Sequence, residues 1–242
     1  MKYAIIAAGE GSRLASEGIA APKPLVNVNG ECLIDRLVSI FAKNGADEIF
    51  VICNEQAKAV AKHIENLEAE GYRGLQLPLR HIVKSTPSSM HSFYELSRLV
   101  GDGPVVLTTV DTIFRDEEFT AYVAAFEKAI AEGYHCMMGV TDYIDDEKPL
   151  YVGTDSDNNI TGFYDKYEDG CRYISGGIYG LTAPCIRTLE ECMAKGVSRM
   201  RNFQRALVAD GLKLKAYPFS KVLDVDHASD IEKAEQFLGN RK

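Results

Sequence analysis

The chain lacks several features that would assign it to particular functional classes. Its 27 Lys and Arg residues are outnumbered by 35 Asp and Glu residues, which gives a net charge of -8 at pH 7. No run of Lys or Arg interrupts this acidic balance, so the sequence offers no basic patch for a phosphate backbone or an anionic lipid surface. We therefore expect neither nucleic acid nor a membrane among its partners.

Long hydrophobic runs are also missing near the start of the chain. The apolar stretch at residues 3–8 ends at Gly9, which makes it too short for the core of a signal peptide or for a membrane span. The six cysteines form no C-x-x-C pair and have no histidine nearby at zinc-ligand spacing. These features predict a cytoplasmic protein whose cysteines are reduced and serve as small hydrophobic side chains.

The sequence does contain an alternation of apolar runs of strand length with amphipathic stretches of helix length. This alternation is typical of β-α units that build a largely parallel sheet, and near-continuous apolar strands predict burial on both faces. The expected strands are residues 3–7, 48–53, 81–83, 105–110 and 135–140. The expected helices between them are residues 33–44, 56–70, 88–99 and 117–132.

The pattern changes after Thr141. Short strand candidates at 151–154, 160–164 and 172–181 are separated by turn-rich segments, which predicts hairpins rather than crossovers. We interpret residues 141–180 as a small β-rich, acceptor-binding insertion in a single domain that spans residues 1–242. Further helices are expected at 184–195, 197–210 and 229–238, with a strand at 213–217.

The strongest local motif follows the first strand. It reads A-A-G-E-G-S-R-L at residues 7–14 and continues with P-K-P-L at residues 22–25. A glycine-rich turn after the first strand lets backbone N–H groups approach a phosphate. The P-loop string G-x-x-x-x-G-K-[ST] is absent, and Leu14 stands where a dinucleotide fingerprint needs its third glycine.

The combination G-x-G-[ST]-R-L with P-K-P-L resembles the nucleoside-diphosphate-sugar pyrophosphorylase family of NTP transferases. The resemblance extends over the whole chain. It implies a three-layer α/β/α, Rossmann-like nucleotidyltransferase fold with a mixed, mainly parallel sheet. It also implies transfer of a nucleoside monophosphate from an NTP to a phosphorylated acceptor, a sugar 1-phosphate or a phospho-alcohol, with release of pyrophosphate.

The glycine-rich loop carries the expected nucleotide-binding and catalytic residues. Loop residues expected to contact the nucleotide are Ala8, Gly9, Gly11 and Ser12. Arg13 and Lys23 would supply positive charge against the attacked phosphorus and the departing pyrophosphate. The prolines on both sides of Lys23 restrict its backbone and would aim its side chain.

Transfer of this kind requires a divalent cation, and Mg²⁺ usually takes one or two protein carboxylates. Asp111 follows the apolar strand at 105–110, at the sheet edge where α/β proteins bind ligands. The resemblance implies that Asp111 and Asp226 hold this ion. Asp224 remains an alternative to Asp226, because alternate strand positions share a face. Capping of a turn or helix is the structural alternative for both Asp111 and Asp226.

The resemblance also indicates residues for the base and the acceptor. Thr86 and Ser89 lie at the start of a predicted helix, in a stretch that lines the nucleobase pocket of the family, although helix capping would also explain serines there. His91 is a further candidate for base contact. Lys166 and Gly177 occupy the positions of a lysine on the acceptor phosphate and a glycine beneath the sugar. A hairpin or bulge would explain that glycine equally well.

The sequence departs from the family pattern at two places. Val110-Asp111 replaces the usual Gly-Asp, and Asp165-Lys166-Tyr167 replaces Glu-Lys-Pro. The alternatives are a molybdenum-cofactor-type nucleotidyltransferase, a non-catalytic nucleotide-binding protein of the same fold, and a glycosyltransferase that uses the D-x-D string at 224–226. The base, the acceptor and the oligomeric state are left open at this stage.

Overall fold

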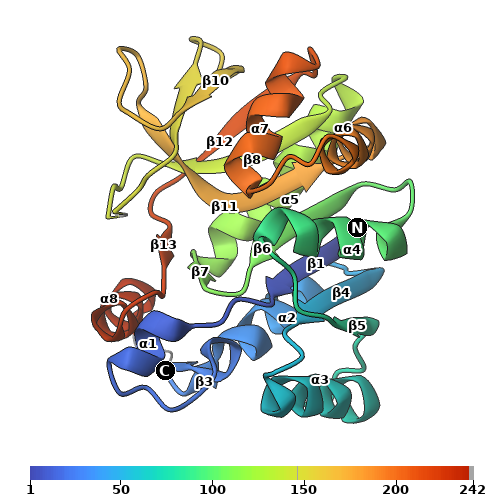
Figure 1. Ribbon diagram of the computed structural model, residues 1–242, viewed down its shortest axis with the longest axis vertical. Helices are drawn as coiled ribbons and strands as arrows, with labels where there is room; N and C mark the ends of the chain where they lie inside the picture. Colours follow the sequence, from blue (N-terminus) through green and yellow to red (C-terminus); the bar gives the residue numbers. More distant parts are fainter. Residues whose placement is uncertain (146, 240–242) are drawn as a thin grey trace.

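The computed structural model describes residues 1–145 and 147–239. Within these residues nine strands form one sheet with helices on both faces (Figure 1). The strands are β1 (Lys2–Ala7), β4 (Glu48–Cys53), β5 (Leu79–Val83), β6 (Val105–Thr109), β8 (Cys136–Thr141), β9 (Tyr151–Thr154), β10 (Ile160–Tyr164), β11 (Tyr173–Leu181) and β12 (Leu214–Phe219). Their order is β10-β9-β11-β6-β1-β4-β5, and β8 joins β11 to β12.

Helices cover the two faces of this sheet as separate layers. The longer helices are α2 (Leu33–Lys43), α3 (Lys58–Glu70), α4 (Ser89–Val100), α5 (Asp116–Ala131), α6 (Ala183–Ala194), α7 (Met200–Ala209) and α8 (Ala228–Leu238). Alternate residues of β1 enter two different hydrophobic cores. Tyr3 and Ile5 pack with α2, α3 and α5, whereas Ala4 and Ile6 pack with α4, α6 and α7. The predicted three-layer α/β/α fold is therefore confirmed.

The first half of the sheet creates a crevice at one edge. β1 is parallel to β4 on one side and to β6 on the other, and β5 extends the sheet beyond β4. The chain thus moves outward from β1 to β5 and then returns to the opposite side of β1 at β6. Such a switch point leaves an open crevice outside the carboxyl ends of β1 and β6, where α/β proteins bind ligands.

The segment at 141–180 contributes to the sheet in two ways. β9 and β10 form the expected antiparallel hairpin at the sheet edge. β11, in contrast, lies inside the sheet, where it runs antiparallel to both β6 and β8. Its register with β8 shifts between Ser175 and Ile178, and Gly177 there adopts a φ of +71°. The bulge that the glycines suggested is present in the pairing of β11 with β8.

Several short elements were not predicted from the sequence. They are α1 (Ser12–Ser16), the 3-10 helix η1 (Lys23–Leu25), and the two-residue strands β2 (Asn27–Val28), β3 (Glu31–Cys32), β7 (Thr112–Ile113) and β13 (Leu223–Asp224). Elements this short contain too few residues to show a hydrophobic period. The helix expected at 197–210 starts only at Met200, because Arg199 has a φ of 75° that no helix allows. Among the helices described here, none has the length and apolar character needed to cross a bilayer.

Candidate active site

The glycine-rich loop lies at the carboxyl end of β1, in the crevice of the sheet. Gly11 ends this loop with a φ of 62° and stands directly before α1. A Cβ atom at Gly11 would lie 3.1 Å from the Cβ of Lys23, so a side chain there would be both strained and crowded. Glycine at this position lets the loop fold closely against η1, which carries Lys23.

A chain of ion pairs joins the loop region to two distant aspartates. The Lys23 Nζ atom donates to Asp111 Oδ2 at 2.6 Å and to Asp226 Oδ1 at 2.5 Å. The Arg13 Nη1 atom donates to Asp226 Oδ2 at 2.9 Å. Burial acts against the charge of Lys23, but the carboxylates of Asp111 and Asp226 outweigh burial and hold its pKa above the usual value. Lys23 therefore remains a cation clamped between two carboxylates.

Strand pairing between β7 and β13 explains why the aspartates meet. Asp224 pairs with Thr112, and the backbone N–H of Val225 donates to the carbonyl oxygen of Asp111 at 3.1 Å. This pairing brings the segment before α8 alongside the end of β6. The acidic residues at 111 and 226, which are far apart in the sequence, become neighbours as a result.

Asp224 is a third carboxylate at this junction. Its side chain is exposed in the adjoining cleft and accepts a hydrogen bond from the Thr112 hydroxyl. Its protein surroundings and the charges of Asp111 and Asp226 raise the pKa of Asp224 to about 8. Three acidic side chains thus lie close to one lysine. An additional cation near them would stabilise their charged forms.

The capping alternative for Asp226 is not what the structure shows. His227 occupies the N-cap of α8, and Asp230 Oδ2 accepts from the backbone N–H groups of Asp226 and His227 at 3.2 and 2.8 Å. Glu17 completes the arrangement, since its carboxylate contacts His227 Nδ1 at 2.6 Å and accepts from the Ala228 N–H at 2.7 Å. These contacts fix the start of α8 and leave the Asp226 carboxylate free to bind Lys23 and Arg13.

A cleft of about 420 Å³ lies between the loop after β1 and the start of α4. Predicted site residues that line this cleft are Ala8, Gly9, Gly11, Lys23, Thr86, Ser89 and Asp111. Ser12 instead lies on the exposed first turn of α1. The predicted nucleotide-binding residues, with the exception of Ser12, therefore line one cleft.

The rim of this cleft includes polar residues that the sequence analysis missed. Asn54 follows β4 and donates from its Nδ2 atom to the carbonyl oxygen of Ala8 at 3.3 Å. Its Oδ1 atom accepts from the Ser85 hydroxyl at 3.0 Å and from the Gln56 N–H at 2.8 Å. A polar residue directly after a buried strand was the available signal, because the ends of parallel strands share one edge.

The start of α4 forms the opposite side of the cleft. Ser88 is the N-cap residue, but its hydroxyl contacts His91 Nδ1 at 2.8 Å instead of a backbone N–H group of the first turn. The Thr86 hydroxyl contacts the Ser92 hydroxyl at 2.6 Å. His91, the further candidate for base contact, is half-buried and pairs with the Ser88 hydroxyl.

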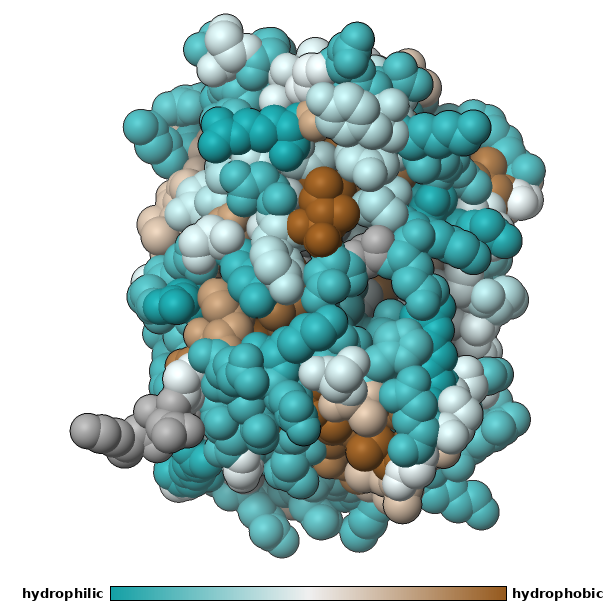
Figure 2. Space-filling model, turned by 90° about the vertical axis from the view of Figure 1, so that its left-hand side faces the viewer, coloured by the Kyte–Doolittle hydropathy of each residue, from teal (hydrophilic) through white to brown (hydrophobic). Residues whose placement is uncertain are grey.

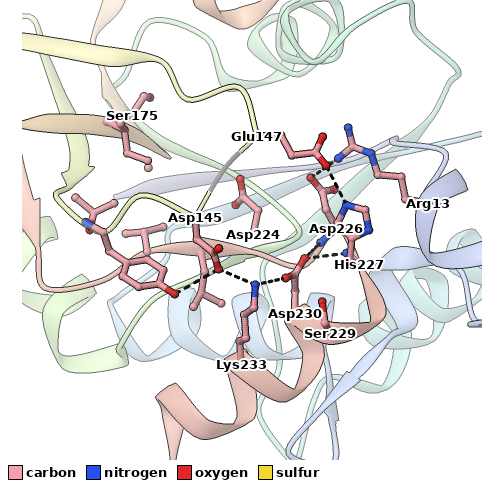
Figure 3. Close-up of a pocket in the computed structure, with 16 residues that line it drawn as sticks. Arg13, Asp145, Glu147, Ser175, Asp224, Asp226, His227, Ser229, Asp230 and Lys233 are labelled. Atoms are coloured by element: carbon pink, nitrogen blue, oxygen red, sulfur yellow. Dashed lines mark hydrogen bonds and ion pairs between the residues drawn. The ribbon is translucent and has the colours of Figure 1, made fainter. Parts of the chain in front are cut away.

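A second, acidic cleft of about 250 Å³ lies on the other side of the aspartate junction (Figure 3). Asp224, Asp226 and Gly176 line it together with residues of α8. Lys233 of α8 donates to Asp145 at 2.7 Å and to Asp230 at 3.1 Å, which ties the loop after β8 to α8. Figure 2 views the molecule from the side of α8 and β13 and shows a largely hydrophilic face.

Lys166 lies in a neighbouring open hollow, away from Gly177. This hollow is formed by the turn after β10 and the start of α7, and its lining includes Arg199, Arg201 and Arg205. Asp165 holds two of these arginines, with contacts of 2.5 Å to Arg201 and 2.8 Å to Arg205. Gly177 instead faces Thr112 beside the acidic cleft. The two predicted acceptor residues therefore belong to adjacent surfaces, not to one.

The fold and the site define an α/β protein with a glycine-rich loop and a lysine–carboxylate cluster at the switch point of its sheet. The chain belongs to the nucleotidyl transferase family, whose sequence pattern matches residues 2–241. It is 27% identical over 66 residues to glucose-1-phosphate cytidylyltransferase of Salmonella typhimurium, a match over 27% of this chain and 26% of that protein. It is 25% identical to the bifunctional protein GlmU of Staphylococcus carnosus over 99% of this chain. That match spans 53% of GlmU, about half of its length.

Solved structures show the same fold at low sequence identity. The inositol-1-phosphate CTP transferase from T. maritima superposes with a TM-score of 0.75 at 19% identity, over 98% of this chain and 97% of that one. A protein assigned as a glucose-1-phosphate thymidylyltransferase from Bacillus anthracis superposes with a TM-score of 0.84 at 19% identity, over 100% and 96% of the two chains. The predicted family and the predicted fold are both confirmed.

Proposed function

We propose that this chain transfers a nucleoside monophosphate from an NTP to a small phosphorylated acceptor, a sugar 1-phosphate or a phospho-alcohol, and releases pyrophosphate. The observation that carries this proposal is the clamp of Lys23 between Asp111 and Asp226. It lies at the switch point of the sheet, beside the glycine-rich loop. Membership of the nucleotidyl transferase family supports the same reaction class.

The reaction needs alignment and charge compensation more than proton transfer. An oxygen of the acceptor phosphate attacks the α-phosphorus of the NTP and forms a new P–O bond. The bond from the α-phosphorus to the bridging oxygen breaks, and its electron pair leaves on pyrophosphate. Because the acceptor phosphate is already anionic near neutral pH, no general base is required. Arg13 and Lys23 offset the negative charge on the triphosphate and on the leaving group.

The two aspartates have the chemistry that a magnesium ion requires. The Asp111 and Asp226 oxygens both reach one Lys23 Nζ atom, so they converge on a single cation position. An all-oxygen donor set at such a point fits Mg²⁺, which when bound would neutralise charge on the phosphate oxygens. Lys23 and Arg13 would then exchange their carboxylate partners for phosphate oxygens.

We assign the cleft beside the loop to the nucleotide. Ala8, Gly9, Gly11 and Ser12 would present backbone N–H groups to the triphosphate at the start of α1. Thr86 and Ser89 lie on the opposite wall at the start of α4 and would contact the base. The N-terminus of α4 adds a partial positive charge and backbone N–H donors to this wall.

We assign the hollow around Lys166 to the acceptor phosphate. It concentrates three arginines and Lys166 in a chain whose net charge is -8. A locally positive surface on a negatively charged protein attracts a small anion. Gly177 would shape the floor beside the acidic cleft, where an acceptor could approach Asp111 and Asp226. The six buried free cysteines support a reducing, cytoplasmic location.

Pyrophosphate release tests this proposal directly. Each of the four NTPs is incubated with Mg²⁺ and a panel that includes sugar 1-phosphates, phosphocholine and a pterin phosphate. Release that depends on both an NTP and a sugar or alcohol phosphate supports the proposed reaction. Release only with the pterin would favour a molybdenum-cofactor-type transferase instead. NTP binding without release in any combination would favour a non-catalytic nucleotide-binding protein.

A further inference from the structure

A group of metal-binding side chains lies outside the proposed catalytic cleft. Cys32 is the N-cap residue of α2, and Asp35 lies in the first turn of the same helix. His63 reaches them from α3, and its Nε2 atom lies 2.6 Å from Asp35 Oδ1 and 3.8 Å from Cys32 Sγ. The three ligand atoms all lie within 4.8 Å of one another. The thiol, the carboxylate and the imidazole therefore converge on one small volume.

The arrangement differs from a catalytic relay. In a relay the histidine uses one ring nitrogen for the nucleophile and the other for the orienting carboxylate. Here the same Nε2 atom of His63 faces both Cys32 and Asp35. Convergence of several donor atoms on one point is instead the geometry of ligands around a single ion.

We propose that Cys32, Asp35 and His63 form a zinc site that is distinct from the magnesium site of the catalytic cleft. Sulfur, nitrogen and oxygen donors together suit Zn²⁺, whereas Mg²⁺ takes oxygen alone. Tetrahedral zinc with bonds of about 2.0–2.3 Å separates its ligand atoms by roughly 3.3–3.7 Å. The Sγ–Nε2 distance of 3.8 Å exceeds this range only slightly, and the Asp35–His63 pair has to open by less than ~1 Å.

The protein around the three side chains fixes their positions and leaves a route from solvent to them. Cys32 is buried and Asp35 lies one helical turn further along α2, so their relative position is fixed by the backbone. The His63 side chain is 31% exposed and that of Asp35 is 13% exposed, which gives solvent a route to the cluster. Water would complete the coordination on the exposed side of His63. The bound ion would fasten α3 to the start of α2.

Cobalt titration tests the site with a readout that does not depend on activity. Co²⁺ bound through a thiolate produces a sulfur-to-metal charge-transfer band in the near ultraviolet, which oxygen ligands do not produce. We expect one equivalent of Co²⁺ to give this band in the full-length chain, and Zn²⁺ to abolish it by displacement. Zn²⁺ should also raise the thermal unfolding midpoint, and the rise should continue with the logarithm of the free Zn²⁺ concentration above its Kd.

Variants assign the band to these side chains. Cys32→Ala should abolish it, and His63→Gln should weaken Co²⁺ binding by at least about tenfold, since even outer partners of a metal contribute that much. His81→Gln is the matched control, because His81 Nδ1 forms a comparable pair with Glu68 at 2.8 Å but has no cysteine partner there. Binding in the His81→Gln variant should equal that of the wild type.

The test also separates this site from the proposed function. The double variant Asp111→Asn, Asp226→Asn should keep the cobalt band, because its changes lie at the catalytic carboxylates. Absence of the band in the wild type at saturating Co²⁺ would overturn the zinc site, as would its persistence in Cys32→Ala or its loss in the double variant. Failure of pyrophosphate release would leave these spectra unchanged.

Discussion

At the residue scale, Lys23 holds the proposed catalytic centre together. Its ammonium group is buried between Asp111 and Asp226, and proline lies on each side of it in the sequence. The prolines restrict the backbone of η1, and the two carboxylates restrict the side chain. These restraints keep the Lys23 cation beside the cleft, where it would compensate charge in a transition state.

Lys23→Ala should therefore lower turnover by about two orders of magnitude or more, since loss of one preorganised charge contact typically costs on the order of 3–4 kcal/mol. Steady-state pyrophosphate release measures this change, and circular dichroism checks folding. Lys62→Ala provides the control, because Lys62 is an exposed lysine paired with Glu65 on α3. A folded Lys23→Ala variant with turnover within about threefold of wild type would contradict the assigned role.

Asp111→Asn and Asp226→Asn should each raise the Mg²⁺ concentration needed for activity. Because both side chains are assigned to one ion, the double variant should be less impaired than the sum of the single effects predicts.

Asp224→Asn should have a much smaller effect, because Asp224 bonds to Thr112 while Asp226 binds Lys23. Activity titrated against Mg²⁺ compares the variants. A strong shift in Asp224→Asn with none in Asp226→Asn would reverse the assignment, and full wild-type activity in excess chelator would exclude the metal.

Sequence patterns could single out candidate residues where a motif or a strand end marked them. Gly11, Lys23 and Asp111 belong to such patterns, and the structure brings them into one cleft. The contacts between them could not be predicted, because Lys23 and Asp226 are separated by 203 positions in the chain. The same limit applies to Cys32 and His63, whose proximity depends on how α3 packs against α2.

At the scale of elements, the bulge in β11 connects the sheet to the site. Gly177 has a φ of +71°, and a Cβ atom there would lie 3.0 Å from the Thr112 hydroxyl oxygen. Thr112 belongs to β7, which pairs with β13 and thereby positions Asp224. The glycine thus allows β11 to pass close to the strands that carry the carboxylates.

Gly177→Ala should lower the free energy of unfolding by about 1–3 kcal/mol, from left-handed backbone strain together with crowding of Thr112. Denaturant unfolding followed by circular dichroism measures the change. Gly103→Ala is the matched control, since a Cβ atom there would meet only the end of the Lys2 side chain at 3.9 Å. Equal stabilities of the two variants would show that the bulge tolerates a side chain.

The turn after β10 is attached to α7 by a pH-dependent contact. Hydrogen bonds from Arg205 and then Arg201 hold the pKa of Asp165 below its usual value. A carboxyl group whose pKa is lower in the folded state stabilises the fold above its unfolded pKa, and this contribution disappears as pH falls through the folded value.

Asp165→Asn should therefore lower the thermal midpoint at pH 7 by about 1–3 °C, the scale expected for exposed ion pairs. The difference from wild type should shrink towards zero at an acidic pH below the depressed folded-state pKa of Asp165, where the wild-type carboxyl group loses its charge. Unfolding scans at both pH values provide the comparison. Asp169→Asn, in the same exposed turn, should match the wild type throughout. A difference that persists unchanged at that acidic pH would indicate that packing, not charge, is responsible.

Element type could be predicted from hydrophobic periodicity because most strands and helices here are long and buried. β1, β4 and α2 are examples in which the expected bounds agree with the structure to within a residue or two. Periodicity carries no information on pairing, however. The position of β11 inside the sheet depends on contacts with β6 and β8, which only the folded chain reveals.

At the scale of the whole molecule, the two proposed substrates are assigned to two neighbouring regions. The nucleotide cleft lies at the ends of β1 and β6, whereas the basic hollow lies at β10 and α7, in the upper part of Figure 1. The backbone N–H of Arg199 approaches the Ser88 hydroxyl at 3.4 Å, so the two regions meet where α7 and α4 begin. The separation allows the contribution of each region to be measured independently.

Lys166→Ala should raise the KM for the acceptor by about tenfold or more, the scale expected when a hydrogen bond to a charged group is lost. Binding of the NTP should stay nearly unchanged, because Lys166 belongs to the hollow beyond the nucleotide cleft. Initial rates with one substrate varied and the other saturating separate the two effects.

Lys195→Ala is the control for that measurement, because Lys195 is an exposed lysine paired with Glu191 at the end of α6. Its kinetics should equal those of the wild type for both substrates. If Lys166→Ala weakened NTP binding while the acceptor KM stayed normal, the two regions would have to exchange their assigned substrates.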